Sequence, residues 1–389
     1  MLLAPVFWSA VLLLGWVYLG YPVLVALVGR LRPLRLREDA PAPSISVAIA
    51  VHDEQAQIAA RIADVLAQEG PGVQLAEVLV GSDGSTDATD AVVRDLAAAE
   101  PRLRLLSLPR GGQTSTQNAL FEAARGEVVV LTDAETRFAP GCLAALARPF
   151  RDARVGGVTG RLEWRDEHAT ATSANEGLYW RYERRVRALE SRAGFLTAVT
   201  GALFALRRTA YRPVPATASM DHLLPLYVRE AGGLIVYEPS AVATDRPISG
   251  LREQFRNRSR TATRGLQANL SMARRLTPWR NARAATAIWT HKILRWATPW
   301  LLGLAAITGL GLALAGAPLY GLVPLGILLG LAAAAAGHLV AGSGRRPPRV
   351  LAFARAFAVV NLAFAAAWLN VLRGRRIETW HRAEWTVRS

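Results

Sequence analysis

The chain has 389 residues, 51% of them hydrophobic, and a formal net charge of +16. The apolar content excludes a disordered chain, and the single cysteine, Cys142, excludes a disulfide framework and a cysteine-ligated zinc site. Lys292 is the only lysine, so nearly all of the basic residues are arginines. Their placement decides whether the charge suits nucleic acid or a membrane.

The first 29 residues contain no charged side chain and are followed by Arg30, Arg32, Arg35 and Arg37. A helix needs about 20 apolar residues to cross a membrane, so this run is long enough. The alternative, a cleaved signal peptide, would have a basic start, a shorter apolar core and a small-residue cleavage site, none of which is clear. Arginine clusters are typical of the cytoplasmic side. We therefore predict that residues 1–37 form an N-terminal transmembrane anchor.

Residues 38–245 have a different pattern, in which short β-rich runs alternate with helix-like stretches rich in Ala, Leu and Arg. The runs cover residues 44–51, 77–81, 102–108 and 127–132. This alternation predicts a parallel α/β sheet with right-handed crossovers. Ligands of such sheets bind beyond the carboxyl ends of the strands, so the residues that follow each run are the candidates for a site.

Acidic residues follow three of these runs: Asp53 and Glu54 the first, Asp83 the second, and Asp133 and Glu135 the fourth. Clustered carboxylates need a cation or hydrogen-bond donors, because like charges are otherwise costly. Asp133 and Glu135 can present oxygens to one Mg²⁺ or Mn²⁺ ion, which takes one or two carboxylates and completes its shell with phosphate and water. Alone, each motif has a structural alternative, in which Asp83 and Asp133 form turns and Glu135 is solvated.

Residues 246–283 hold ten arginines against one acid, Glu253, directly before a second apolar region. Few aromatic residues interleave with them, which disfavours a nucleic-acid interface. Their position beside the membrane favours contact with anionic headgroups or an anionic lipid-linked substrate. We therefore predict Arg-rich interfacial helices over residues 246–295 and no nucleic-acid partner.

Residues 296–344 carry no formal charge and are interrupted by Gly316-Ala317-Pro318, which predicts a hairpin of two membrane helices. A further apolar stretch, residues 350–372, contains Arg355 and two asparagines. It can span the membrane, which would leave the basic tail 373–389 outside, or lie in the interface, which would leave the tail inside. Both alternatives stay open, and residues 296–372 are predicted as C-terminal membrane helices.

Five segments in order resemble the membrane-anchored family 2 glycosyltransferases: SISVAIAVHDEQ, VLVGSDGSTD, RGGQTSTQNALFEAARGEVVVLTDAET, TGALFALRR and MDHLLPLYVREAGGLIVYEPSAVA. The resemblance runs from about residue 44 to residue 264. It implies a GT-A (Rossmann-like) nucleotide-sugar domain over residues 38–245 and a reaction that inverts the anomeric centre.

The resemblance also implies roles for individual residues. Asp133 and Glu135 would hold the metal on the diphosphate, Asp83 would hydrogen-bond the uracil ring, and Asp221 would be the general base. The other residues expected to bind the nucleotide sugar are Val51, Asp53, Glu54, Gln113, Asn118, Gly201, Ala202, Arg256 and Arg258. Asp221 opens a helix-like run, so its structural alternative is a helix N-cap. Arg256, Arg258 and Arg260 have an alternative as a solvated or headgroup-facing helix face.

This sequence departs from the family pattern at several positions. Met220 stands where a second acid usually precedes Asp221, and Gln113 stands where many members have lysine. Arg110 is a candidate substitute for that lysine. The Gln-x-x-Arg-Trp motif of processive synthases is absent, and Gln254-Phe255-Arg256-Asn257-Arg258 lies in its region.

We expect a membrane-bound inverting glycosyltransferase of a bacterial inner membrane, with several spans and its catalytic domain facing the cytoplasm. It would move a sugar from a nucleotide sugar, with a UDP-sugar as the expected donor, to a lipid-linked or polysaccharide acceptor, using Mg²⁺ or Mn²⁺. Two alternatives remain: a processive polysaccharide synthase, and a non-catalytic membrane protein that binds nucleotide sugars.

Overall fold

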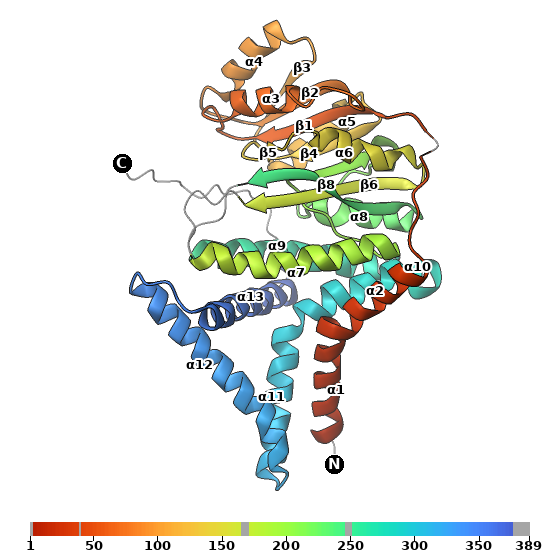
Figure 1. Ribbon diagram of the computed structural model, residues 1–389. Coiled ribbons are helices and arrows are strands. Elements are labelled where there is room, and N and C mark those ends of the chain that lie inside the picture. Colours follow the sequence, from red (N-terminus) through yellow and green to blue (C-terminus); the bar gives the residue numbers. More distant parts are fainter. Residues whose placement is uncertain (1–2, 39, 165–170, 246–250, 376–389) are drawn as a thin grey trace.

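The computed structural model describes residues 3–38, 40–164, 171–245 and 251–375. An eight-stranded sheet lies above a set of long helices (Figure 1). Its order is β3-β2-β1-β4-β7-β6-β8-β5. One half is parallel and contains β1 (Ser44–Val51), β2 (Gln74–Asp83), β3 (Leu103–Leu108) and β4 (Val128–Thr132). These are the four strands that the sequence predicts, and their carboxyl ends share one edge.

The other half of the sheet is mixed. β7 (Phe204–Arg207) runs antiparallel to both β4 and β6 (Val155–Trp164). β8 (Leu234–Asp245) is parallel to β6, and the two-residue β5 (Arg137–Phe138) is antiparallel to β8. The α/β class is therefore confirmed, and the strands beyond β4 extend the sheet past its predicted part.

Side-chain alternation along the strands separates two cores. On β1, Ile45, Val47 and Ile49 face a core shared with α3 (Ile58–Leu66), α4 (Thr89–Ala99) and α6 (Cys142–Ala147). Ala48 and Ala50 face the opposite core, shared with α5 (Gln113–Ala123) and α8 (Met220–Glu230). Burial of both faces explains why these strands are almost continuously apolar.

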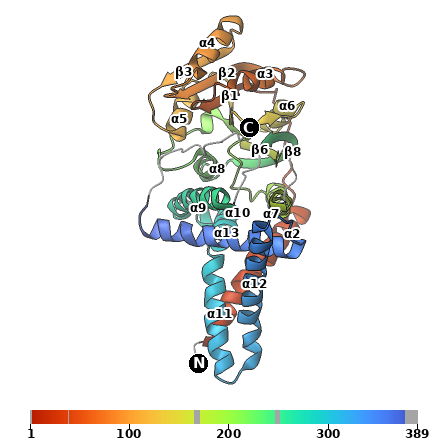
Figure 2. The ribbon, with the colours of Figure 1, turned by 90° about the vertical axis from the view of Figure 1, so that its left-hand side faces the viewer.

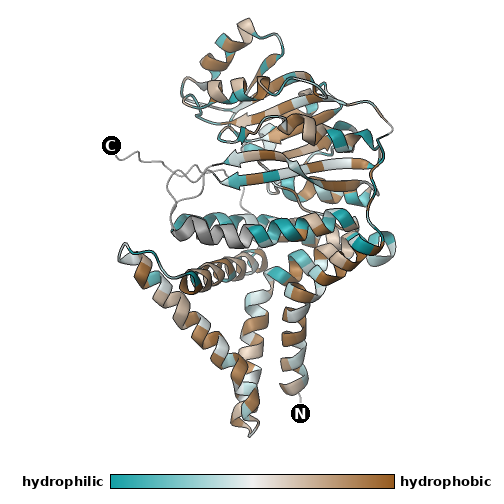
Figure 3. Ribbon diagram, in the orientation of Figure 1, coloured by the Kyte–Doolittle hydropathy of each residue, from teal (hydrophilic) through white to brown (hydrophobic). Residues whose placement is uncertain are grey.

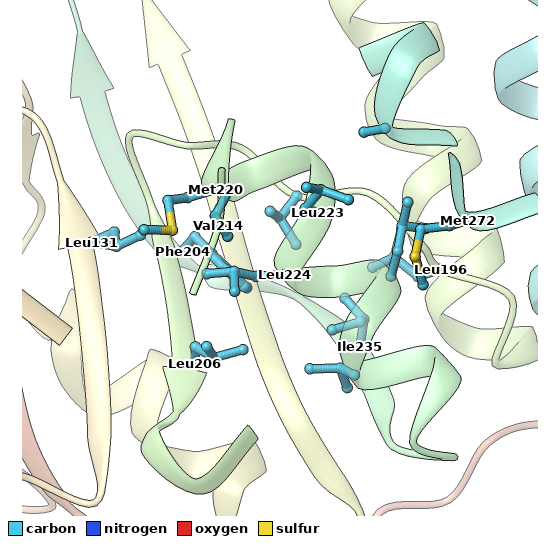
Figure 4. Close-up of a cluster of buried hydrophobic side chains, with 14 of the residues drawn as sticks. Leu131, Leu196, Phe204, Leu206, Val214, Met220, Leu223, Leu224, Ile235 and Met272 are labelled. Atoms are coloured by element: carbon cyan, nitrogen blue, oxygen red, sulfur yellow. The ribbon is translucent and has the colours of Figure 1, made fainter. Parts of the chain in front are cut away.

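The second of these cores continues below the sheet. Figure 4 shows Leu131, Phe204 and Leu206 of the strands facing Leu223 and Leu224 of α8, with Met272 of α9 (Leu251–Ala273) beyond them. Val360, Phe364 and Ala367 of α13 (Arg349–Leu372) belong to the same buried cluster. The sheet and the helices beneath it therefore share one hydrophobic core. α7 (Ala171–Ala193) lies in the same layer and, like α9, contacts α13.

The remaining helices project away from the sheet. α1 (Leu3–Gly15) continues through the π-helical turn η1 (Trp16–Gly20) into α2 (Tyr21–Leu31). α10 (Pro278–Ala287) and η4 (Ile288–Leu294) lead to α11 (Thr298–Leu314), and the chain then reverses through η5 (Pro318–Gly321) into α12 (Leu322–Gly342). This reversal is the hairpin that the Gly316-Ala317-Pro318 break predicts.

Within the described residues, three helical stretches are long and apolar enough to cross a membrane: Leu3–Leu31, Pro318–Gly342 and Arg349–Leu372. A fourth would arise if Pro278–Leu294 and Thr298–Leu314, which meet at 62°, form one span. Hydrophobic residues dominate α1, α11, α12 and α13 (Figure 3). α1 and α11 point away from the sheet in both views, whereas α13 lies across their direction, directly below α9 (Figures 1 and 2).

Candidate active site

The loops after β1 and β2 are tied together by the carboxylate of Asp53. Asp53 Oδ1 accepts hydrogen bonds from the backbone N–H of Thr86 at 2.7 Å and of Asp87 at 3.3 Å. These bonds lower the pKa of Asp53. In return, the backbone N–H of Asp53 donates to Ser85 Oγ. Asp53 has a φ of 54°, the left-handed region that Asp and Asn tolerate better than most residues. Its side chain thus braces the two loops.

Asp83, at the end of β2, is fully buried and holds the loop that precedes α5. Its carboxylate accepts hydrogen bonds from the backbone N–H of Gly111 at 2.7 Å and of Gly112 at 3.0 Å. The Arg110 guanidinium pairs with the same group at 2.7 Å. Arg110, the candidate substitute for the missing lysine, is therefore engaged by Asp83.

A cluster of carboxylates surrounds Asp133 at the end of β4. Burial, with further contributions from Asp245, Glu135 and Asp221, raises the pKa of Asp133 to about 7. Gln113 Nε2 lies 3.5 Å from Asp133 Oδ1. Asp245 is the last residue of β8, as Thr132 is the last residue of β4. The sequence analysis does not predict Asp245 as a site residue, because it does not predict β8 as a strand.

The donor atoms around Asp133 suit a hard divalent cation. Carboxylate oxygens are the ligands that Mg²⁺ and Mn²⁺ prefer, and a cation would favour the ionised form of Asp133, which burial and the neighbouring carboxylates disfavour. Among the described residues, no three Asp, Glu, His or Cys side chains converge to hold an ion by themselves. Phosphate and water oxygens would therefore have to complete the coordination shell, as is usual for Mg²⁺.

Asp221 lies in the first turn of α8, and its surroundings are the opposite of those of Asp133. Ser219 occupies the N-cap position, so Asp221 is not the cap residue. Burial would raise the pKa of Asp221, but His222, Ser219 and Arg264 outweigh it and hold the pKa well below its usual range. Ser219 Oγ donates a hydrogen bond to Asp221, and His222 Nδ1 lies 3.1 Å from Asp221 Oδ1.

The backbone at Gly201 lies close to this carboxylate. A Cβ atom at Gly201 would lie 3.5 Å from the Asp221 side chain. Gly201 therefore lies directly against the carboxylate. Across from it, Arg264 of α9 donates hydrogen bonds to the carbonyl oxygen of Ala218 at 2.8 Å and to Thr114 Oγ1 at 3.2 Å.

One cavity of about 400 Å³ connects these groups. Six of the predicted residues line it: Gln113, Asp133, Gly201, Ala202, Asp221 and Arg258. Arg260 and Arg264, one turn apart on α9, add positive charge to its wall. Its other end is formed by Lys292 of η4, Trp296 and Phe364 of α13. The cavity therefore runs from the edge of the sheet to the apolar helices.

The other predicted residues do not line this cavity: Val51, Asp53, Glu54, Asp83, Asn118, Glu135 and Arg256. The Val51 side chain is buried in the core beside α3, and Arg256 is exposed on α9. Asn118 Oδ1 accepts hydrogen bonds from the Tyr211 hydroxyl and the Val214 backbone N–H, and Asn118 Nδ2 donates to the Val214 carbonyl. Asn118 thus fastens the segment before α8 to α5.

Comparisons with known proteins agree with this geometry. The family model Glycosyl transferase family 2 matches residues 46–214. These residues form a family 2 glycosyltransferase domain. The chain is 27% identical over 219 residues to an N-acetylglucosaminyltransferase of Mesorhizobium japonicum, covering 52% of this chain and 51% of that protein. A β-monoglucosyldiacylglycerol synthase of a Nostoc species is 28% identical over 155 residues, covering 39% and 33%. The chain spans about half the length of the curated relatives it matches.

The chain resembles a solved structure over almost its whole length. A mannosyltransferase from Pyrobaculum calidifontis, solved with GDP-Man and Mn²⁺, superposes with a TM-score of 0.69. The match covers 95% of this chain and all of that one at 21% identity. At this identity the match shows the fold alone, and the GT-A architecture is confirmed.

Proposed function

We propose that this glycosyltransferase is a membrane-bound inverting enzyme that transfers a sugar from a nucleotide sugar to a lipid-linked acceptor. The observation that carries the proposal is the single cavity that joins Asp133 and Asp221 to Lys292, Trp296 and Phe364. A water-soluble acceptor would have no need of a route that ends among the apolar helices.

Asp133 and Glu135 would hold Mg²⁺ or Mn²⁺ on the diphosphate of the donor, with Asp245 beside them. When bound, the ion supplies positive charge that stabilises the leaving nucleoside diphosphate. Arg258, Arg260 and Arg264 face the same cavity and would neutralise phosphate charge without a metal. Gln113, in the place of the usual lysine, contributes no charge, so these α9 arginines supply it instead.

Asp221 would act as the general base. The acceptor hydroxyl oxygen attacks the anomeric carbon from the face opposite the diphosphate, the bond from that carbon to the diphosphate oxygen breaks, and Asp221 takes the hydroxyl proton. The lowered pKa keeps Asp221 ionised at neutral pH and makes it a weak base. Proton transfer would therefore come late, when the attacking hydroxyl has lost electron density and become acidic.

The acceptor would reach the site from the membrane side. Its lipid part would lie near Trp296 and Phe364, and an anionic group on it would meet Lys292 or the α9 arginines. The orientation of α13 supports the interfacial alternative for residues 350–372. Arginines follow α2 and α12 in the sequence, which favours a cytoplasmic active site in the inner membrane.

The relatives suggest which donors to test first. Two of the matched proteins are named as an N-acetylglucosaminyltransferase and a glucosyldiacylglycerol synthase, so UDP-GlcNAc and UDP-glucose lead the panel, with GDP-mannose as a third donor. A processive polysaccharide synthase is the second candidate, since the same cavity would also lead a growing chain towards the membrane helices. A ladder of products with excess donor would favour the synthase, and one added sugar would favour the lipid-linked transferase.

The experiment is nucleotide release by the detergent-purified chain with each donor, with and without a bacterial lipid extract. We expect release with one donor that requires lipid extract and is lost with EDTA or in the Asp133→Asn variant. Release that is indifferent to lipid, or that survives EDTA unchanged, would contradict the proposal.

A further inference from the structure

A second cavity, of about 450 Å³, lies where the N-terminal helix meets the catalytic domain. Three separate elements build it: the segment after α2, the turn before β6, and α10. It shares no lining residue with the catalytic cavity. We call it the arginine pocket, because it is lined by Pro33, Leu34, Leu36, Arg32, Arg35, Arg37, Arg154 and Arg283.

The positive charge of the arginine pocket is largely uncompensated. Arg154 pairs with Asp152 at 2.6 Å, and Asp152 also accepts a hydrogen bond from the backbone N–H of Arg37. In the part of the chain that the structure describes, no carboxylate pairs with the side chains of Arg32, Arg35, Arg37 and Arg283. Guanidinium groups around one hollow repel one another unless an anion lies between them.

The surroundings of the pocket are amphiphilic and adjoin the membrane helices. Arg32 directly follows the candidate span Leu3–Leu31. Tyr21 and Val25 of α2 belong to one buried cluster with Ala287 of α10. Leu31 is 80% exposed and Trp279, at the start of α10, is 83% exposed. Exposed leucine and tryptophan beside arginine are typical of a membrane interface.

We propose that the arginine pocket binds the phosphate of an anionic phospholipid. Guanidinium groups bind phosphate oxygens through paired, charge-assisted hydrogen bonds, and Arg32 and Arg283 would approach the phosphate from opposite walls. The acyl chains would follow the exposed apolar side of α2. The alternating apolar residues Leu34 and Leu36 favour an amphiphile over a free phosphate ion, which would gain nothing from them.

A lipid held in this pocket would join three elements that are distant in sequence. The phosphate would link the end of α2 and α10 to the turn before β6, which belongs to the sheet. It would thereby fix the catalytic domain against the membrane surface. This role is independent of the transfer reaction, so it can be tested without a known donor or acceptor.

The test compares two double variants of the full chain in neutral detergent. Arg32→Gln/Arg283→Gln removes two charges from the pocket. The matched control, Arg345→Gln/Arg349→Gln, removes two exposed charges before and at the start of α13. The thermal midpoint is measured with added phosphatidylglycerol, with phosphatidylcholine and with inorganic phosphate alone, and co-purified lipids are quantified by mass spectrometry.

We expect phosphatidylglycerol to raise the midpoint of the wild-type chain and of the control by several degrees, and to bind the pocket variant at least tenfold more weakly. Co-purified anionic lipid should fall in the pocket variant alone. Equal losses in both variants would mean diffuse electrostatic attraction and would overturn the proposal. So would an equal shift with phosphatidylcholine, or a full shift with inorganic phosphate, which would indicate a site for free anions.

Discussion

Two carboxylates face the same cavity from different elements, and their surroundings shift their pKa values in opposite directions. Burial and, after it, the neighbouring carboxylates raise the pKa of Asp133, at the end of β4, to about 7. Asp221, in the first turn of α8, has Ser219, His222 and Arg264 as neighbours, and its pKa is lowered. Neighbouring carboxylates are suited to bind a cation. A carboxylate that hydrogen-bond donors and positive charges keep ionised is available to accept a proton. In the proposed mechanism, these neighbours would give different roles to two chemically identical groups.

The largest effect is expected for Asp221→Asn. An amide cannot take the proton of the acceptor hydroxyl, so turnover should fall by about 100- to 10,000-fold, while the affinity for the donor stays within about threefold. Turnover and donor binding are measured on the same preparation. A variant that keeps more than a tenth of wild-type turnover would remove Asp221 from the role of base.

The pH dependence of metal binding tests the other carboxylate. Below pH 7 a proton occupies Asp133 and competes with the cation, so the affinity for Mn²⁺ should rise about tenfold between pH 6 and pH 8. Calorimetric titration of the full chain with Mn²⁺ and donor measures this directly. A Mn²⁺ affinity that does not change between pH 6 and pH 8 would mean that Asp133 is already ionised at pH 6 and that its pKa is not raised.

Without metal, replacing the two carboxylates should change the thermal stability of the chain in opposite directions. Asp133 has a folded-state pKa above its unfolded value, so its charge costs stability as the pH rises from about 4 to 7, and Asp133→Asn should stabilise the chain at pH 8. Asp221 has a lowered pKa, so its charge adds stability that is lost as the pH falls below about 4, and Asp221→Asn should destabilise the chain at pH 8. Each change should be about 1 kcal/mol, or a few degrees in the thermal midpoint measured with EDTA. Shifts of the same sign would contradict the comparison.

The smallest effect is expected for Gln113→Lys. The new ammonium group would lie near Asp133, stabilise its ionised form and lower its pKa. The midpoint of the pH profile for Mn²⁺ binding should then move to lower pH by less than one pH unit. Gln113→Met, which has a similar length and no charge, serves as the control and should leave the midpoint in place.

The sequence predicts the parallel half of the sheet because β1 to β4 are apolar runs with turn signals at their ends. It also predicts that Asp133 and Asp221 belong to the site, through motifs that stay local in the chain. It does not predict Asp245, because polar residues interrupt β8 and hide the strand that carries it. Nor does it predict that Asp83 and Asn118 are held by backbone groups of distant segments, because these contacts depend on how α5 packs. The cavity joins α8, α9, η4 and α13, a combination that only the tertiary structure creates.

Following a radiolabelled sugar tests most directly whether the sugar is transferred to a lipid-linked acceptor. The full chain is incubated with the active donor and a bacterial lipid extract, and the label is then partitioned between organic solvent and water. We expect label in the organic phase with the wild-type chain and none with Asp221→Asn. Label that appears only in a water-soluble product, at the same rate with and without the lipid extract, would contradict a cavity that receives its acceptor from the membrane.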